Sequence, residues 1–114
     1  MQPAERDIHI IKHIDQYCGQ IRATIERFGE SEETFLSDFV YQNAVALCII
    51  QIGELVGNLS EEYRIEHKEI PWRQIRSVRS IVVHNYGSVD AETLWEIIQK
   101  DIPELKEYCT KELK

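Results

Sequence analysis

The sequence predicts an all-α domain, an up-and-down bundle of four or five helices that forms a two-fold dimer. Apolar residues recur at spacings of three, four and seven along most of the chain, which is the period of amphipathic helices. No segment shows the alternation of a half-buried strand, and no repeat or linker divides the chain. With 114 residues, 43% of them hydrophobic, the chain can bury one core, so we expect a single domain over 1–114.

Two helices are predicted in the first third of the chain. The first runs from about Glu5 to Phe28 and ends at Gly29. Its predicted apolar face consists of Ile8, Ile11, Cys18, Ile21, Ile25 and Phe28. Ser31, followed by two acidic residues, predicts the start of a short helix with Phe35 and Leu36.

A second long helix is predicted from Asp38 to Leu59. Its middle, residues 44–50, is apolar on every side, which is typical of a central helix covered by its neighbours or by a second subunit. Gly53 interrupts this helix, and we expect the glycine to allow close packing.

Three further starts follow. Ser60 is the predicted N-cap of a short helix that reaches about residue 66. Pro71 is expected at the first position of the next helix, which ends near Gly87. Asp90 is expected to cap a last long helix that Pro103 interrupts or restarts. Trp72 and Trp95 are predicted core anchors.

Composition excludes several classes of protein. The net charge of −7 argues against a protein that coats nucleic acid along its whole surface. Cys18, Cys48 and Cys109 lack metal-ligand spacing and lie among apolar residues, so we expect reduced core thiols. No signal peptide is visible, and the apolar run 44–50 is far shorter than the ~20 residues of a membrane span. We expect a cytoplasmic protein that is not associated with a membrane.

Basic residues gather in one part of the chain. Residues 61–89 carry a net charge of +1, whereas 1–60 carry −5 and 90–114 carry −3. Arg73, Arg76 and Arg79 are spaced three residues apart with no acid from 73 to 89, so they form a stripe along one helix. The stripe is either a solvated face or a local anion site.

Residues 79–86 read Arg-x4-His-x-Tyr. Arg79 can hold a phosphate with its guanidinium fork, His84 titrates near neutral pH, and Tyr86 offers a hydroxyl. No carboxylate pair for a metal lies nearby, which suggests metal-independent RNA cleavage with the 2′-hydroxyl as nucleophile. On one regular helix Arg79 and Tyr86 lie within roughly 20° of each other, but Arg79 and His84 lie roughly 140° apart. We therefore expect either a distorted helix or a site completed by a second chain, and we favour the dimer.

This motif occurs with Ile52-Gly53-Glu54 and Ile70-Pro71-Trp72 before it, and with Asp90 and Leu94-Trp95 after it. The combination resembles the HEPN superfamily, and more narrowly the HepT-like toxins that pair with MNT-type nucleotidyltransferase antitoxins. The resemblance covers nearly the whole chain and implies a HEPN-like helical dimer whose motifs meet in a cleft that cleaves RNA without a metal or cofactor.

The resemblance also implies roles for single residues. Arg79 and His84 would be catalytic, and Tyr86 would be the tyrosine to which the antitoxin attaches AMP. Ser80 departs from the Asn, Asp or His that often follows the arginine, but its hydroxyl can still bind substrate. The predicted phosphate- and RNA-binding residues are Arg73, Arg76, Ser80 and Asn85, and Asn85 has a helix cap as its other possible role.

Two other candidates are weaker. His9 and His13 have metal-ligand spacing but no third ligand, so we expect no metal. Glu54 follows Gly53 on a helix expected to be buried, so it either pairs with an arginine such as Arg79 or points outward.

Three functions remain open at this point: a ribonuclease toxin, a non-catalytic helical dimer that binds a nucleotidyltransferase, and a nucleotide-binding module that delivers substrate to that transferase. Arg79 and His84 favour the first function, whereas the acidic net charge mildly favours the other two.

Overall fold

The structure is a computed structural model that describes residues 4–77 and 91–114. These two ranges are helical and contain no strand, which confirms the predicted all-α class. In chain order, the elements are α1 (Glu5–Phe28), α2 (Glu32–Ser37), α3 (Phe39–Asn58), α4 (Glu61–Glu66), a helical stretch over 72–77, α6 (Ala91–Glu96), the π-helical turn η1 (Ile97–Asp101) and α7 (Ile102–Glu112).

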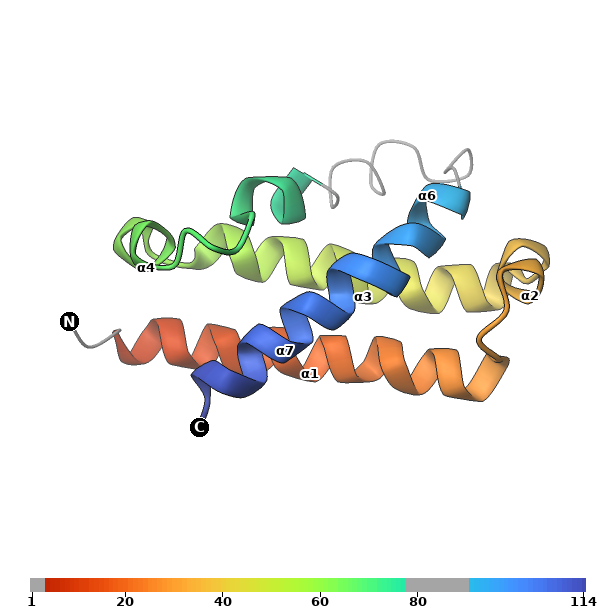
Figure 1. Cartoon of the computed structure of the whole chain (residues 1–114), viewed down its shortest axis with the longest axis horizontal. Coiled ribbons are helices and arrows are strands. Elements are labelled where there is room, and N and C mark those ends of the chain that lie inside the picture. Colours follow the sequence, from red (N-terminus) through yellow and green to blue (C-terminus); the bar gives the residue numbers. More distant parts are fainter. Residues whose placement is uncertain (1–3, 78–90) are drawn as a thin grey trace.

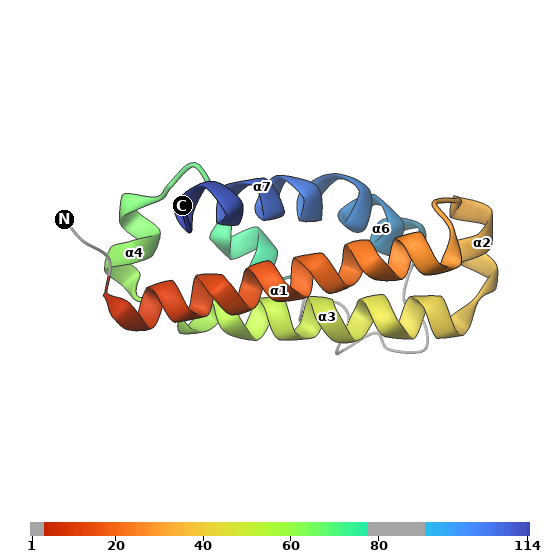
Figure 2. The same ribbon diagram turned by 90° about the horizontal axis from the view of Figure 1, so that it is seen from below.

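The two long helices α1 and α3 lie side by side and run in opposite directions (Figure 1). The continuous rod formed by α6, η1 and α7 crosses them obliquely on one side, with α7 packed against α1 (Figure 2). The short helices α2 and α4 lie at opposite ends of the bundle. The 72–77 stretch follows α4, so the start of the predicted motif helix lies toward the α4 end.

Helix α1 has the predicted bounds. It ends where Gly29 adopts a φ of 112°, which favours glycine, and the Gly29 amide donates to the Ile25 carbonyl at 2.8 Å. The buried stripe differs from the prediction because Ile8 and Phe28 are only half-buried, whereas Ile10 and Ile14 are buried. The buried residues of α1 are Asp7, Ile10, Ile11, Ile14, Cys18, Ile21 and Ile25.

Helix α3 begins after Asp38, whose carboxylate accepts hydrogen bonds from the amides of Val40 and Tyr41. It is not buried on every side. Val40 and Leu47, which are 50% and 60% exposed, lie seven residues apart on an outward stripe. By length and composition α3 is apolar enough to cross a membrane, but its inner face packs on α1 as the core helix of a bundle does.

The last helix is continuous past Pro103, with a local change of winding. Proline has no amide hydrogen, so it cannot donate to the carbonyl four residues earlier. The turn before it is π-helical, and the Ile102 amide donates to the Ile97 carbonyl, five residues back. Pro103 is therefore tolerated near the start of α7. The predicted cap Asp90 lies outside the described residues.

Aromatic rings fill the α2 end of the core. The centroid of the Phe35 ring lies 4.8 Å from the ring centroid of Tyr41 and 5.3 Å from that of Trp95. Trp95 packs against this core, which confirms it as a core residue.

All three cysteines are buried and unpaired, as predicted.

Candidate functional site

The structure describes three of the eight predicted site residues. Glu54, Arg73 and Arg76 lie in the described part of the chain. The others, Arg79, Ser80, His84, Asn85 and Tyr86, lie outside the described residues. The described residues form the part of the site that precedes Arg79. They show which contacts hold the 72–77 stretch, where the predicted motif helix begins, and which surfaces lie beside that stretch.

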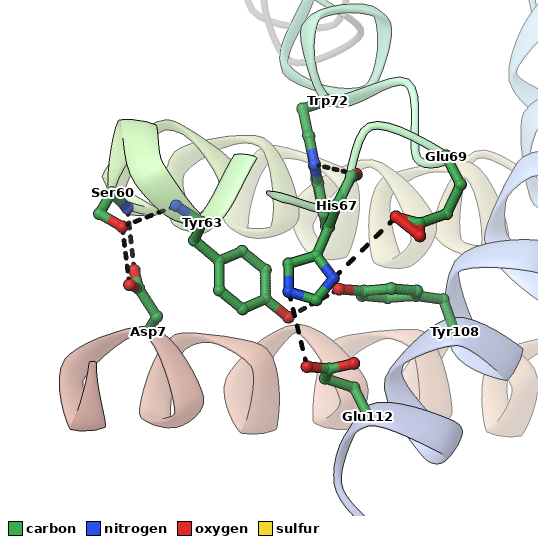
Figure 3. A network of polar contacts seen from close by, with 8 residues as sticks. All are labelled: Asp7, Ser60, Tyr63, His67, Glu69, Trp72, Tyr108 and Glu112. Atoms are coloured by element: carbon green, nitrogen blue, oxygen red, sulfur yellow. Dashed lines mark hydrogen bonds and ion pairs between the residues drawn. The ribbon is translucent and has the colours of Figure 1, made fainter. Parts of the chain in front are cut away.

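Trp72 anchors the start of the 72–77 stretch, as the sequence predicts. Its side chain is buried, and its indole nitrogen donates to the His67 carbonyl at 3.0 Å (Figure 3). The centroid of the Trp72 ring lies 5.7 Å from the ring centroid of Tyr108 on α7 and 6.2 Å from that of Tyr63 on α4. Contacts with two other helices fix where the arginine-bearing stretch begins, because a buried tryptophan with a satisfied N–H has little freedom to move.

A polar cluster supports Trp72 from below. The Tyr63 and Tyr108 hydroxyl oxygens are 2.7 Å apart, and the imidazole of His67 stacks on the Tyr63 ring at 4.2 Å. Its Nε2 lies 3.7 Å from a carboxylate oxygen of Glu112, and its Nδ1 lies 4.0 Å from one of Glu69 (Figure 3). Burial raises the pKa of both tyrosines well above 10, so both hydroxyls stay protonated.

Asp7 ties α1 to this cluster. Its side chain is buried and accepts from the Ser60 amide at 2.8 Å and from the Ser60 hydroxyl at 2.7 Å. The Ser60 oxygen in turn accepts from the Tyr63 amide at 3.1 Å, which confirms Ser60 as the N-cap of α4. The N-terminus of α4 is thus fixed by a residue 53 positions earlier in the chain.

Arg73 and Arg76 are both exposed, as a phosphate-binding stripe requires. Arg76 passes close over α3 at Gly57: a Cβ placed on that glycine would lie 3.1 Å from the Arg76 Nε. Glu54, one turn earlier on α3, is exposed. The predicted pairing of Glu54 with Arg79 lies outside the described residues, so the choice between this pairing and an outward-facing Glu54 stays a prediction.

An apolar groove opens on the other side of the 72–77 stretch. It has a volume of about 130 Å³ and lies between α3, residues 69–75 and the η1–α7 rod. Its apolar floor is formed by Ile49, Ile52, Ile70, Pro71, Ile75, Ile97, Ile102 and Leu105. Glu69, Asp101 and Glu104 supply carboxylates along it.

No metal centre forms among residues 4–77 and 91–114. No group of three or more His, Cys, Asp or Glu side chains there is arranged to hold an ion. His9 and His13 are exposed on α1. Burial raises the pKa of Cys109 to about 12, and the same cause raises the pKa of Cys18 and Cys48, so these thiols are poor nucleophiles.

Sequence reasoning missed the supporting cluster and the groove. Asp7 was visible only as an acid in the first turn of a helix, and nothing in the sequence links it to Ser60. His67, three residues before the Ile70-Pro71-Trp72 start, carried no periodic signal. Asp101 and Glu104 lie on either side of Pro103. The proline predicted an interruption of the last helix, but no pattern in the sequence predicted a groove there.

The comparisons with known proteins agree on one family. The family model described as "Ribonuclease HepT-like" matches residues 10–112. A protein of Caldanaerobacter subterraneus subsp. tengcongensis, named as a putative RNase, is 39% identical over 84% of each chain. A "Probable ribonuclease HepT" of Thermococcus cleftensis is 39% identical over 65% of this chain and 67% of its own.

A Methanocaldococcus jannaschii protein named as a gamma-glutamylcyclotransferase and putative RNase is 35% identical over 88% of this chain, which corresponds to 47% of that longer protein. No solved structure shows a significant match.

Proposed function

The chain belongs to the HepT-like ribonuclease family, and from this premise we propose that it is the toxin of a toxin–antitoxin pair, a metal-independent endoribonuclease. The observation that carries the proposal is the extent of the family match, residues 10–112, which includes the whole Arg-x4-His-x-Tyr motif at 79–86. The names of the relatives support RNA as the substrate. The exposed positions of Arg73 and Arg76 next to the motif support a phosphate-binding surface.

The proposed reaction is transesterification within the RNA. His84 takes the proton of a 2′-hydroxyl, whose oxygen attacks the adjacent phosphorus. The bond from phosphorus to the 5′-oxygen breaks, that oxygen takes a proton from water as it leaves, and the proton on His84 passes to solvent. Arg79 holds the non-bridging oxygens and stabilises the charge that develops on them. The products are a 2′,3′-cyclic phosphate and a 5′-hydroxyl, with no net oxidation or reduction.

A cleavage assay in the presence of EDTA tests this proposal. We expect activity to persist without divalent metal and to fall by at least ~100-fold in His84→Ala, because a general base contributes about 10²–10⁴-fold. Arg79→Ala should lose comparable activity, and Arg79→Lys should recover little of it because a point charge does not replace the guanidinium fork. His9→Ala removes an exposed histidine and serves as the matched control. Full activity of His84→Ala, or loss of activity in EDTA, would contradict the mechanism.

The proposed active form is a homodimer in which two motif helices meet. The support is the outward stripe of α3, where Val40 and Leu47 are exposed although they are apolar. Glu54 continues this stripe seven residues after Leu47. A second copy packed along the stripe would cover these side chains and bring the two Glu54 regions, and the 72–77 stretches whose Arg76 passes close to Gly57, toward one another.

The proposed antitoxin is an MNT-type nucleotidyltransferase that inactivates the toxin by adding AMP to Tyr86. The Tyr86 oxygen would attack the α-phosphorus of ATP, pyrophosphate would leave, and the phenolic proton would pass to solvent. The added phosphodiester carries about one negative charge, which is suited to pair with the arginines of the stripe and to compete with RNA there.

A further inference from the structure

We propose that the acidic-rimmed apolar groove is the docking site for a segment of the nucleotidyltransferase in which aliphatic side chains are flanked by lysine or arginine. The proposal rests on the function proposed above, which supplies the partner, and it assigns to that partner a surface separate from the arginine stripe. The floor of the groove, its rim, and its position relative to the other two surfaces each support this occupant.

The floor fits aliphatic side chains. Isoleucine and leucine residues from α3, residues 70–75 and the η1–α7 rod supply most of it. A volume of about 130 Å³ is well below the ~300–1,000 Å³ of pockets for drug-sized ligands. The groove is therefore suited to one or two inserted side chains of a protein, and it is too small to enclose a nucleotide.

The rim selects for positive charge. Glu69, Asp101 and Glu104 are all exposed, and none of the described residues that line the groove is a lysine or an arginine. Asp101 and Glu104 make no hydrogen bond or ion pair within the described part of the chain, so their charges are not neutralised by neighbours there. Such a rim repels the phosphates of RNA and attracts a cationic segment. The apolar floor in turn disfavours a bare metal ion or a fully solvated cation.

The groove is separate from the proposed RNA-binding surface. On the 72–77 stretch, Arg73 and Arg76 project on average ~180° away from Gln74 and Ile75, which line the groove. A partner in the groove would therefore contact the opposite side of the same stretch from a bound phosphate.

The groove is also separate from the proposed dimer stripe. On α3 the groove residues Ile49 and Ile52 lie roughly 140–200° around the helix from Leu47. Both copies of a dimer would thus keep the groove free, and the transferase could be held while its chemistry reaches the motif helix.

Isothermal titration calorimetry with the purified nucleotidyltransferase and the full chain tests the proposal. We expect Asp101→Asn/Glu104→Gln to weaken binding about tenfold, the effect of losing two charge contacts at a rim. Added salt should weaken binding to the unaltered chain more steeply than binding to this variant. Gln74→Trp, which fills the groove from an exposed position, should weaken binding by a similar factor.

The charge-matched control is Glu32→Gln/Glu33→Gln on α2, which contributes no residue to the groove lining and should bind as the unaltered chain does. RNA cleavage without the transferase should be unchanged in all of these variants. Equal binding by the rim variant and the unaltered chain would overturn the groove assignment and leave the proposed function intact. No binding of the transferase to the unaltered chain would overturn the pairing itself and the groove assignment with it.

Discussion

The Asp7 carboxylate, buried in the first turn of α1, accepts two hydrogen bonds from Ser60, the residue that caps α4 (Figure 3). This contact joins the beginning of the chain to the segment that precedes the motif helix. Because Trp72 is held by the Tyr63 ring and the His67 carbonyl, the position of α4 determines where the arginine-bearing stretch begins. A local substitution on α1 should therefore affect both stability and the site.

Asp7→Ala is expected to lower the free energy of unfolding by about 2–4 kcal/mol. The substitution removes a charged acceptor and leaves the half-buried amide and hydroxyl of Ser60 without this partner. Urea unfolding followed by circular dichroism measures the change. Glu5→Ala, an exposed acid in the same helical turn, is the control and should stay within about 0.5 kcal/mol of the unaltered chain. Equal effects of the two substitutions would show that the Asp7 contact contributes nothing specific.

Stability is expected to fall above about pH 9. Burial raises the pKa of Cys109 from 9.0 to about 12 in the folded chain, so the unfolded chain loses this proton first. The contribution of the protonated Cys109 thiol to the free energy of unfolding is complete below pH 9. It is lost as the pH rises toward 12, at about 1.4 kcal/mol per pH unit. Tyr63 and Tyr108 act in the same direction from about pH 10 upward.

Urea unfolding at pH 7, 9 and 10.5 measures this slope. Cys109→Ala should be less stable at pH 7, because it leaves a small cavity, and should lose stability less steeply above pH 9. Ile102→Val, a core change on the same helix without an ionisable group, should keep the slope of the unaltered chain. A slope unchanged in Cys109→Ala would show that the thiol ionises as easily in the folded chain as in the unfolded one.

Local signals in the sequence predicted the helices well. The helix start at Ser31, the N-cap Ser60 and the terminator Gly29 depend on residues close to them in the chain, and all three are confirmed. Asp38, predicted as the first residue of the second long helix, is its N-cap. What the sequence could not supply is the pairing of distant residues, such as Asp7 with Ser60. Exposure was also harder to predict than helix formation, because Leu47 belongs to an apolar run and yet faces outward.

The candidate site was predictable only in its motif and its arginine stripe. The groove depends on how the η1–α7 rod crosses α3, and no spacing in the sequence encodes that crossing. Ile49 and Ile97, for example, are far apart in the chain and line the same groove. The assignment of Arg79, His84 and Tyr86 stays a prediction, since these residues lie outside the described part of the chain.

Leu47→Lys is expected to convert a dimer into a monomer. The leucine is 60% exposed on the outward stripe of α3, and a charge there would be buried against a second copy. Light scattering should give about twice 13.4 kDa for the unaltered chain and 13.4 kDa for the variant, which should also lose RNA cleavage. Ile65→Lys on α4, which alters an isoleucine that is 54% exposed, should remain dimeric. A monomeric unaltered chain at micromolar concentration would remove the argument for a site shared by two copies.

Arg73→Gln/Arg76→Gln is expected to raise the KM for RNA several-fold with little change in kcat. The two arginines are exposed residues about one turn apart, so they are placed to contact phosphates and not to take part in the chemical step. The salt dependence of RNA binding should become shallower by about 0.7 per lost contact on a logarithmic plot. Arg22→Gln/Arg27→Gln, on the exposed surface of α1, makes the same change in charge and should leave both quantities unchanged. An equal loss in both pairs would indicate a general effect of net charge.

Tyr86→Phe is expected to abolish addition of AMP and to leave the toxin active in the presence of the transferase. Tyr86 lies just before Gly87 and within roughly 20° of Arg79 on a regular helix, so an attached nucleotide would extend along the phosphate-binding stripe. Its phosphodiester would pair with an arginine and block RNA both by charge and by bulk. Mass spectrometry of the chain co-expressed with the transferase should show added AMP, and the phenylalanine variant should show none. Tyr17→Phe controls for a general effect of losing a tyrosine hydroxyl. Modification that persists in Tyr86→Phe, or a modified chain that still cleaves RNA at the full rate, would contradict this mode of inactivation.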